Sequence, residues 1–295
     1  MRILIDLQAK QNGSRDRGIG RYSLALTRAI ARNALGHQIC VLLNGLFPES
    51  VDEVRAALAD VIPEQNTFVF AAHGPVDELL TENAWRLRAG EIIREQVIND
   101  LAPDFVLICS LFDGSCDNTI SSVGSMRSDV PVAVILYDLI PFLDPDKYIG
   151  WPPARNWYFR KIDSLKRAQL LLSISQSAAR EGIENLHIHE RRVVNISSAV
   201  DLSFAKSTFS HEMEASFLQR MRINRKFLMH TSAFEPRKNF EGLIQAFAAI
   251  PKKLRTEVQL VLVCKLRDSE RVALTDLAGT LGLGEDELIL TGFIA

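Results

Sequence analysis

Two adjacent basic residues stand at the start of a predicted helix in the last third of the chain. Residues 227–251, FLMHTSAFEPRKNFEGLIQAFAAIP, predict a buried strand ending at Thr231, a short loop, and an amphipathic helix that Asn239 caps. Arg237 and Lys238 add positive charge where the helix dipole is already positive. A bound anion such as a diphosphate would offset that cost. The alternative is that both side chains extend into water.

A glycine-rich segment, QAKQNGSRDRGIGRYS, follows the first predicted strand. Gly18 and Gly20 precede a helix predicted to begin near Arg21, and glycine lets backbone N–H groups approach an anion closely. The string resembles a dinucleotide fingerprint, but Gly18 lies eleven residues beyond Leu7 and the next strand ends in Asn44 instead of an acid. NAD binding is therefore disfavoured. A flexible surface loop is the alternative interpretation.

A carboxylate follows the predicted strand Val132–Leu136, where a parallel sheet opens to solvent and ligands collect. Asp138 could hold a ligand hydroxyl, accept a proton, or cap the following turn. Its neighbour Tyr137 could stack or donate a hydrogen bond, although a half-buried structural tyrosine is the commoner case.

The other reactive side chains predict structure more than chemistry. Ser173, Ser175 and Ser177 suit helix N-cap positions, because no His and Asp accompany them in a nucleophile arrangement. His187 and His189 point to opposite sides of an extended backbone, and no CxxC pair occurs, so we expect no metal site. The cysteines that lie in apolar runs, and that we expect to be buried, are Cys40, Cys109 and Cys264.

The elements that must position these residues alternate between short β-branched runs and amphipathic stretches, which is typical of a parallel sheet covered by helices. The predicted strands are 3–7, 38–43, 67–70, 105–109, 132–136, 170–174, 192–196, 227–231, 258–263 and 288–290. The predicted helices are 21–35, 51–58, 76–101, 151–167, 176–185, 239–250 and 269–281. The fold class is α/β: a complete Rossmann-like domain over 1–203 and a partial second one over 204–295.

Length and composition exclude several classes of protein. A chain of 295 residues with 47% hydrophobic and 24% charged residues is neither disordered nor fibrous. A net charge of −2 provides no basic field for nucleic acid. The longest apolar stretch, 130–137, is far shorter than the ~20 residues of a membrane helix, and MRILIDL predicts a strand instead of a signal peptide. We expect a cytoplasmic location, with peripheral contact of a local patch with a membrane left open.

The second series of elements is shorter than the first. It stops at residues 292–295, directly after its third strand, which leaves a sheet edge unpaired. We therefore expect a fragment, or a truncated product, of a longer two-domain protein.

The order of several motifs resembles the retaining glycosyltransferases of family 4, which have the GT-B fold. The motifs are GIGRY at 18–22, YDLIP at 137–141, SISQSAAR at 173–180, NISSAVD at 195–201 and EPRKN at 235–239. The resemblance spans essentially the whole chain, and the combined order is more specific than any single string. YDLIP together with EPRKN is most similar to mannosyltransferase-like members that build bacterial surface polysaccharides from GDP-mannose.

The resemblance implies an acceptor-binding domain followed by the first half of a nucleotide-sugar-binding domain, with the donor held in the cleft. It implies transfer of a hexose to a glycan or lipid-linked acceptor, with no metal and no cofactor besides the donor. Lys238, with Arg237 beside it, would neutralise the donor diphosphate, and Gly18 and Gly20 would approach the phosphates from the other domain. Asp138, the catalytic candidate, would face the sugar or the acceptor.

The sequence departs from the family pattern at three places. Ser232 stands where many relatives have Arg, and Tyr137 stands where many have His. A pair of glutamates that holds the donor should lie beyond Ala295, so the chain alone is expected to have little activity. Ser232, Tyr137 and Glu235 are further candidate donor contacts.

A second hypothesis is a noncatalytic binding or assembly subunit with a degraded transferase fold. Missing donor residues favour this hypothesis, whereas Lys238 and the glycine loop favour descent from a working enzyme. An NAD-dependent sugar-modifying enzyme is a third option, which the long first loop disfavours.

Overall fold

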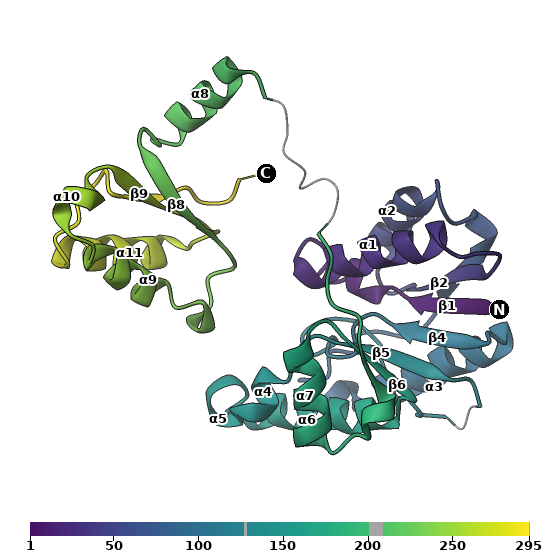
Figure 1. The fold of residues 1–295 in the computed structure, drawn as a ribbon. Coiled ribbons are helices and arrows are strands. Elements are labelled where there is room, and N and C mark those ends of the chain that lie inside the picture. Colours follow the sequence, from purple (N-terminus) through teal and green to yellow (C-terminus); the bar gives the residue numbers. More distant parts are fainter. Residues whose placement is uncertain (127–128, 201–208, 295) are drawn as a thin grey trace. The chain divides into compact units, whose positions relative to one another are not determined.

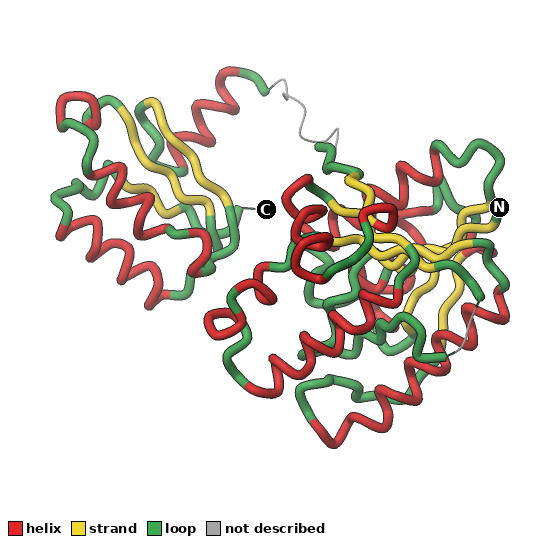
Figure 2. The backbone as a smooth tube through the Cα atoms, turned by 60° about the horizontal axis from the view of Figure 1, so that its bottom comes forward, coloured by secondary structure: helices red, strands yellow, loops and turns green. Residues whose placement is uncertain are grey.

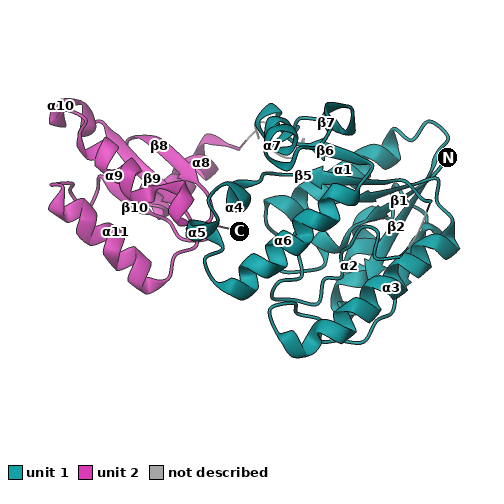
Figure 3. Ribbon diagram, turned by 90° about the horizontal axis from the view of Figure 1, so that it is seen from below, with its two compact units in different colours: residues 1–202 teal, residues 203–295 magenta. Residues whose placement is uncertain are grey.

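The computed structural model describes residues 1–126, 129–200 and 209–294. The chain divides into two compact units, residues 1–202 and 203–295 (Figure 3). The expected boundary at 203 falls within 201–208, outside the described residues. Each unit is built on a parallel sheet (Figure 1).

Unit 1 contains a seven-stranded parallel sheet in the order β3-β2-β1-β4-β5-β6-β7 (Figure 1). The strand order reverses between β1 and β4, because the chain first builds outward from β1 to β3 and then returns to start at β4. The strands are β1 (Arg2–Asp6), β2 (Gln38–Asn44), β3 (Thr67–Phe70), β4 (Phe105–Ile108), β5 (Val132–Leu136), β6 (Leu170–Ser173) and β7 (Val193–Asn195). This is a doubly wound sheet, as the sequence predicts.

Helices cover both faces of this sheet, because successive strand side chains point to opposite faces and both faces are apolar (Figure 2). Ile5 and Val41 belong to the core under one group of helices, and Leu4 and Leu42 belong to the core under the other. The first group is α1 (Gly18–Arg32) and α2 (Pro48–Leu58). The second group is α3 (Ala84–Leu101), α6 (Pro152–Arg167) and α7 (Gln176–Leu186).

Unit 2 contains a three-stranded parallel sheet in the order β10-β9-β8. The strands are β8 (Lys226–Thr231), β9 (Val258–Val263) and β10 (Leu288–Leu290). Helices α9 (Phe240–Ala248) and α11 (Asp268–Thr280) share a core with one face, while Ile223 and the end of α8 (His211–Arg220) pack on the other (Figure 1). In the described part of the chain, β8 and β10 each bond only to β9, so β8 is one of the two edge strands of this sheet.

All ten predicted strands are present, whereas the helices differ at their ends. The helix predicted over 76–101 begins at Ala84, because residues 71–80 form an irregular loop and Thr81–Asn83 forms a 3₁₀ turn. Helix α8 was not predicted, although Ser210 caps it by accepting a hydrogen bond from the Met213 amide. Three further helices of four residues were not predicted either: α4 (Ile140–Leu143), α5 (Pro145–Tyr148) and α10 (Lys252–Arg255).

An ion pair is buried under the carboxyl end of β1. Arg94 of α3 is 0% exposed and Asp6 is 3% exposed. Arg94 donates from Nε to Asp6 Oδ2 at 2.7 Å and from Nη1 to the Ser122 carbonyl at 3.2 Å. Gln8 Nε2 donates to both Asp6 oxygens, at 3.1 and 3.0 Å. The pair therefore joins β1, α3 and the loop after β4, in a setting where each charge depends on the other.

Charged side chains between α3 and α6 contact residues 109–126, the described first part of the connection between β4 and β5. Glu91 pairs with Arg160 at 2.6 Å, and Arg160 also pairs with Glu78. Burial alone would raise the pKa of Glu91, but the charge and hydrogen bond of Arg160 outweigh it and hold that pKa below its usual range. Lys161, 1% exposed, donates to the Ser121 carbonyl and hydroxyl at 2.7 and 2.8 Å. Buried charged side chains of α3 and α6 thus hold this part of the connection in place.

None of the helices in the described residues is long and apolar enough to cross a membrane.

Replacing Arg94 by Gln is expected to lower the free energy of unfolding of unit 1 by about 3–5 kcal/mol, because Asp6 is left buried without its partner. All three tryptophans of the chain, Trp85, Trp151 and Trp157, lie in unit 1, so urea unfolding followed by tryptophan fluorescence reports this unit. The matched control is Arg32→Gln, whose Asp60 partner is exposed, with an expected loss below about 1 kcal/mol. Equal losses in both variants would contradict the role assigned to the buried pair.

The lowered pKa of Lys161 predicts that the free energy of unfolding rises at alkaline pH. Burial, followed by the charge of Arg160, lowers the pKa of Lys161 to about 8, against 10.5 in the free side chain. Between these values the folded protein has lost a proton that the unfolded chain still binds, so the free energy of unfolding rises with pH. Relative to Lys161→Met, the wild type should gain stability across this window, by on the order of 3 kcal/mol at most. Parallel pH curves for the two proteins would refute this expectation.

Candidate functional site

The strand order of unit 1 reverses between β1 and β4, and loops that follow such strands diverge to leave a crevice for ligands. The loop after β1 contains a short 3₁₀ turn, Gln8–Lys10, and then reaches Asn12. Asn12 Nδ2 donates to Thr119 Oγ1 of the β4–β5 loop at 3.0 Å, and Gln8 Nε2 donates to the Ile120 carbonyl at 2.7 Å. Both loops are therefore joined at this edge of the sheet by buried polar contacts.

Gly18 and Gly20 lie in the first turn of α1, which begins at Gly18 and not near Arg21 as the sequence predicts. Gly20 is buried, and its amide donates to the Ser14 carbonyl at 3.2 Å. A Cβ at Gly20 would lie 2.5 Å from that carbonyl oxygen, so this glycine serves the packing of the loop on the helix. Gly18 is exposed, and a Cβ there would meet nothing within 4 Å. Of the two, Gly18 has the backbone that a ligand can approach.

Tyr137, at the end of β5, lies against the start of α1. Its hydroxyl is 3.3 Å from Ser23 Oγ, and its ring meets Tyr22 edge to face at 5.9 Å between centroids. Burial raises the pKa of Tyr137 above its ordinary value, and it raises the pKa of the neighbouring Cys109 thiol to about 12. Both groups stay protonated at neutral pH. Tyr137 therefore acts as a hydrogen-bond donor or an aromatic wall, and not as a base.

Asp138 is exposed, and its Oδ1 accepts a hydrogen bond from the Ile140 amide at 3.1 Å. Of the three interpretations of this residue, the one that fits is a role in the turn: Asp138 closes an Asx turn directly before α4, whose N-cap position is Leu139. Its other oxygen remains available to solvent. Of the three serines that suit an N-cap position, Ser175 caps α7, by accepting from the Ala178 amide at 3.1 Å.

Asp113, in the β4–β5 loop, is a carboxylate at this edge that sequence reasoning did not single out. Its Oδ2 is buried without a hydrogen-bond partner in the part of the chain that the structure describes. Burial raises the pKa of Asp113, while hydrogen bonds from Ser110 and Asn12 lower it in part. No motif marks this residue, because the contacts that bring it to the edge come from other loops.

In unit 2, Arg237 and Lys238 do not lie in the helix itself. They form a 3₁₀ turn, Pro236–Lys238, directly before Asn239, which caps α9 by accepting from the Gly242 amide at 3.1 Å. Glu235 Oε2 accepts from Arg237 Nε at 2.7 Å, so this cation is partly neutralised. The Lys238 side chain is half-buried and has no hydrogen-bond or ion-pair partner among the residues described. The cationic character of the turn thus rests mainly on Lys238.

Ser232 lies between β8 and this turn. Its hydroxyl is 3.1 Å from His230 Nε2 and donates to the Ala233 carbonyl at 3.1 Å. The His230 ring meets Phe240 of α9 edge to face at 5.2 Å. Ser232 is therefore tied to the strand end, and as an uncharged group it does not replace an arginine opposite a diphosphate.

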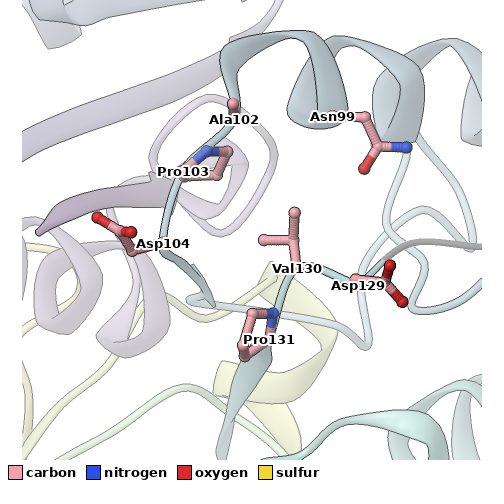
Figure 4. Close-up of a pocket in the computed structure, with 7 residues that line it drawn as sticks. All are labelled: Asn99, Ala102, Pro103, Asp104, Asp129, Val130 and Pro131. Carbon is pink, nitrogen blue, oxygen red and sulfur yellow. The ribbon is translucent and has the colours of Figure 1, made fainter.

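Residues 1–126, 129–200 and 209–294 contain no group of three or more His, Cys, Asp or Glu side chains placed to hold a metal ion. Cys40, Cys109 and Cys264 are buried, as expected, and Cys116 is exposed. A hollow of about 490 Å³ lies at the opposite, amino-terminal edge of the sheet, where Asn99 and Asp129 flank Val130 (Figure 4). It is a shallow surface depression away from every candidate residue.

Sequence relatives of the chain are bacterial mannosyltransferases. The serotype-specific mannosyltransferase WbdA of Escherichia coli is 36% identical over 295 residues, which is 100% of this chain and 35% of that protein. Another Escherichia coli WbdA is 34% identical over 270 residues, or 33% of its length. The chain thus spans about a third of the curated relatives it matches. No family model matches the sequence.

Solved structures with a similar fold include proteins in complex with UDP or a UDP-sugar. Anabaena HepE, in complex with UDP and glucose, superposes with a TM-score of 0.60 at 18% identity, covering 100% of this chain and 70% of that one. A glycosyltransferase of Rickettsia africae gives 0.59 at 14% identity, covering 100% and 68%. The UDP-GlcNAc 2-epimerase of Neisseria meningitidis gives 0.56 at 17%, covering 100% and 73%. The predicted GT-B-type α/β fold is confirmed.

Gly20→Ala and Gly18→Ala should differ in their effect on stability, because only Gly20 packs against the loop before α1. The added methyl at Gly20 meets the backbone of residues 14 and 15 and should lower the free energy of unfolding of unit 1 by about 1–3 kcal/mol. The methyl at Gly18 meets open space and should change stability by no more than about 0.5 kcal/mol. Urea unfolding followed by tryptophan fluorescence measures both. A Gly20→Ala protein as stable as the Gly18→Ala protein would overturn this assignment.

Proposed function

We propose that the chain is part of a retaining hexosyltransferase of family 4 that moves mannose from GDP-mannose to a glycan or lipid-linked acceptor in surface polysaccharide synthesis. The single observation that carries this proposal is 36% identity along the whole chain to a mannosyltransferase. Unit 1 would bind the acceptor, and unit 2 would bind the nucleotide sugar.

Lys238 is the group that we assign to the donor diphosphate. Negative charge builds on the leaving diphosphate as the glycosidic bond loosens, so a cation that meets this charge stabilises the transition state. Lys238 is a cation without an acidic partner in the described residues, directly before a capped helix whose N-terminus also favours anions. Arg237 would assist only after leaving Glu235, with which it pairs at 2.7 Å. No metal or separate cofactor enters this proposal.

Two residues of unit 1 would contact ligand groups. Gly18 would offer its open backbone at the start of α1 to a phosphate group, and the exposed oxygen of Asp138 would accept a hydroxyl of the sugar or acceptor. Tyr137 would border this region as a neutral aromatic side chain. Glu235 and Ser232 would act only indirectly, through Arg237 and the end of β8.

We also propose that β8 is an inner strand of a larger sheet in the working enzyme. Phe227, Leu228 and Met229 of this strand are 42, 52 and 61% exposed, an apolar surface that a soluble sheet edge ordinarily avoids. The relatives are about three times as long as the chain, so they contain residues that could pair with β8. We place the enzyme in the cytoplasm, with contact at the inner face of a membrane only where the acceptor is lipid-linked.

A noncatalytic assembly subunit is the second candidate, and the same exposed strand favours it, because a partner protein could cover β8 by strand addition. The two candidates differ in what they require of Lys238. Only the enzyme needs its charge.

Replacing Lys238 by Ala should weaken GDP-mannose binding and mannosyl transfer roughly ten- to hundredfold, the loss expected for one charge-assisted hydrogen bond of about 1.5–3 kcal/mol. Binding is measured by calorimetry on the 295-residue chain, and transfer is measured on a C-terminally extended chain. Lys252→Ala, which removes an exposed lysine from α10, is the matched control and should leave both quantities unchanged. Unchanged binding in Lys238→Ala would favour the assembly subunit.

A further inference from the structure

We propose that Asp113 binds a hydroxyl group of the acceptor sugar at the carboxyl edge of unit 1. This inference rests on the proposed function and adds a specificity residue to it. Nothing in the motifs of the chain assigns a role to this carboxylate.

The first support is its place in the fold. Asp113 follows β4, and the strand order reverses between β1 and β4. At such a reversal the neighbouring loops leave toward opposite faces of the sheet, and the space between them is where polar ligands enter doubly wound proteins. Asp113 therefore stands at the edge where a ligand is expected on topology alone.

The second support is that the loop around Asp113 is fixed before any ligand arrives. Gly114 has φ +91°, and a Cβ there would lie 2.5 Å from the Thr119 carbonyl oxygen, so the loop folds back tightly on itself. The Gly114 carbonyl accepts from the Glu78 amide at 3.1 Å, and the Asn118 side chain accepts from the Val76 amide at 3.1 Å. A pre-ordered carboxylate binds a sugar hydroxyl without an ordering cost.

The third support is that one carboxylate oxygen of Asp113 has no hydrogen-bond donor among the described residues. Oδ2 is buried and has no donor among the residues that the structure describes, and it is the one carboxylate oxygen of that part of the chain in this condition. Neighbouring buried polar side chains are satisfied: Gln8 is bonded through both of its polar ends, and Asn12 bonds Thr119 and the Ser14 amide. A buried carboxylate oxygen without a donor in such a network calls for an external donor.

The chemistry of the surroundings favours a neutral hydroxyl over a cation or an anion. Lys161 is near enough for its charge to lower the pKa of Asp113, which disfavours a further cation, and the carboxylate itself repels phosphate. Tyr137 directly follows β5, so an aromatic ring lies at the same carboxyl edge of the sheet. A carboxylate and an aromatic ring at one edge suit a sugar, which presents hydroxyls at its rim and C–H groups on its face.

The test compares Asp113→Asn with the wild type in the 295-residue chain, with α-mannobiose as the probe and saturation-transfer NMR as the readout. The variant keeps the size of the side chain but loses the negative charge. We expect its affinity for mannobiose to fall roughly tenfold or more, while calorimetric GDP-mannose binding stays unchanged. Asp146→Asn, which removes an exposed carboxylate from α5, should bind both ligands like the wild type.

A second variant separates binding from folding. Asp113→Glu keeps the charge but moves the carboxylate by one methylene, so it should also lose mannobiose affinity while the thermal midpoint of unit 1 shows that it is folded. Mannobiose bound equally by the wild type and both variants, or by none of them, would overturn the inference. Loss of GDP-mannose binding by the wild type would instead contradict the proposed function, because Asp113 does not enter that measurement.

Discussion

The buried pair of Asp6 and Arg94 is the interaction on which the site in unit 1 depends. It joins the end of β1 to α3, and Arg94 also holds the Ser122 carbonyl of the β4–β5 loop. A buried ion pair is weak evidence for net stability, because removing two charges from water costs nearly as much as their attraction returns. What it fixes is position: neither partner can move without leaving the other charge unpaired in the protein interior.

Because the Asp6–Arg94 pair holds these segments together, the carboxyl edge of the sheet is both polar and ordered. Gln8, Asn12 and Thr119 form a layer of satisfied hydrogen bonds over an apolar core, and Lys161 supports the same loop from α6. A satisfied layer of this kind is rigid, so it holds the side chains around it in place. Asp113 stands in this layer with an oxygen that lacks a donor, which is why a sugar hydroxyl is the ligand we assign to it.

In unit 2, the positive charge of Lys238 is positioned in a different way. Lys238 is placed by a 3₁₀ turn whose last residue precedes the Asn239 cap, so its position is set by local backbone geometry instead of by a buried network. Glu235 moderates Arg237 and leaves Lys238 as the cation of the turn without an acidic partner in the described residues. The diphosphate hypothesis rests on the electrostatic repulsion between two cations and the helix dipole. Because Glu235 pairs with Arg237, this repulsion is weaker than the sequence suggests. The hypothesis now depends on Lys238 and on the mannosyltransferase relatives.

The sequence by itself determined the alternation of strands and helices, all ten strands, the Asn239 cap and the position of Lys238, because each of these follows from hydrophobic periodicity or from contacts within a few residues. It left three serines open as the cap of α7, of which the structure selects Ser175. Only the tertiary structure decided that Gly20 serves packing, that Glu235 pairs with Arg237, and that α3 begins at Ala84. It alone brought Asp113 to Asn12 and Lys161, residues far away in the chain. Burial and hydrogen-bond satisfaction are properties of the assembled fold, because they depend on contacts between residues far apart in the chain, and the local spacing of residue types does not reveal them.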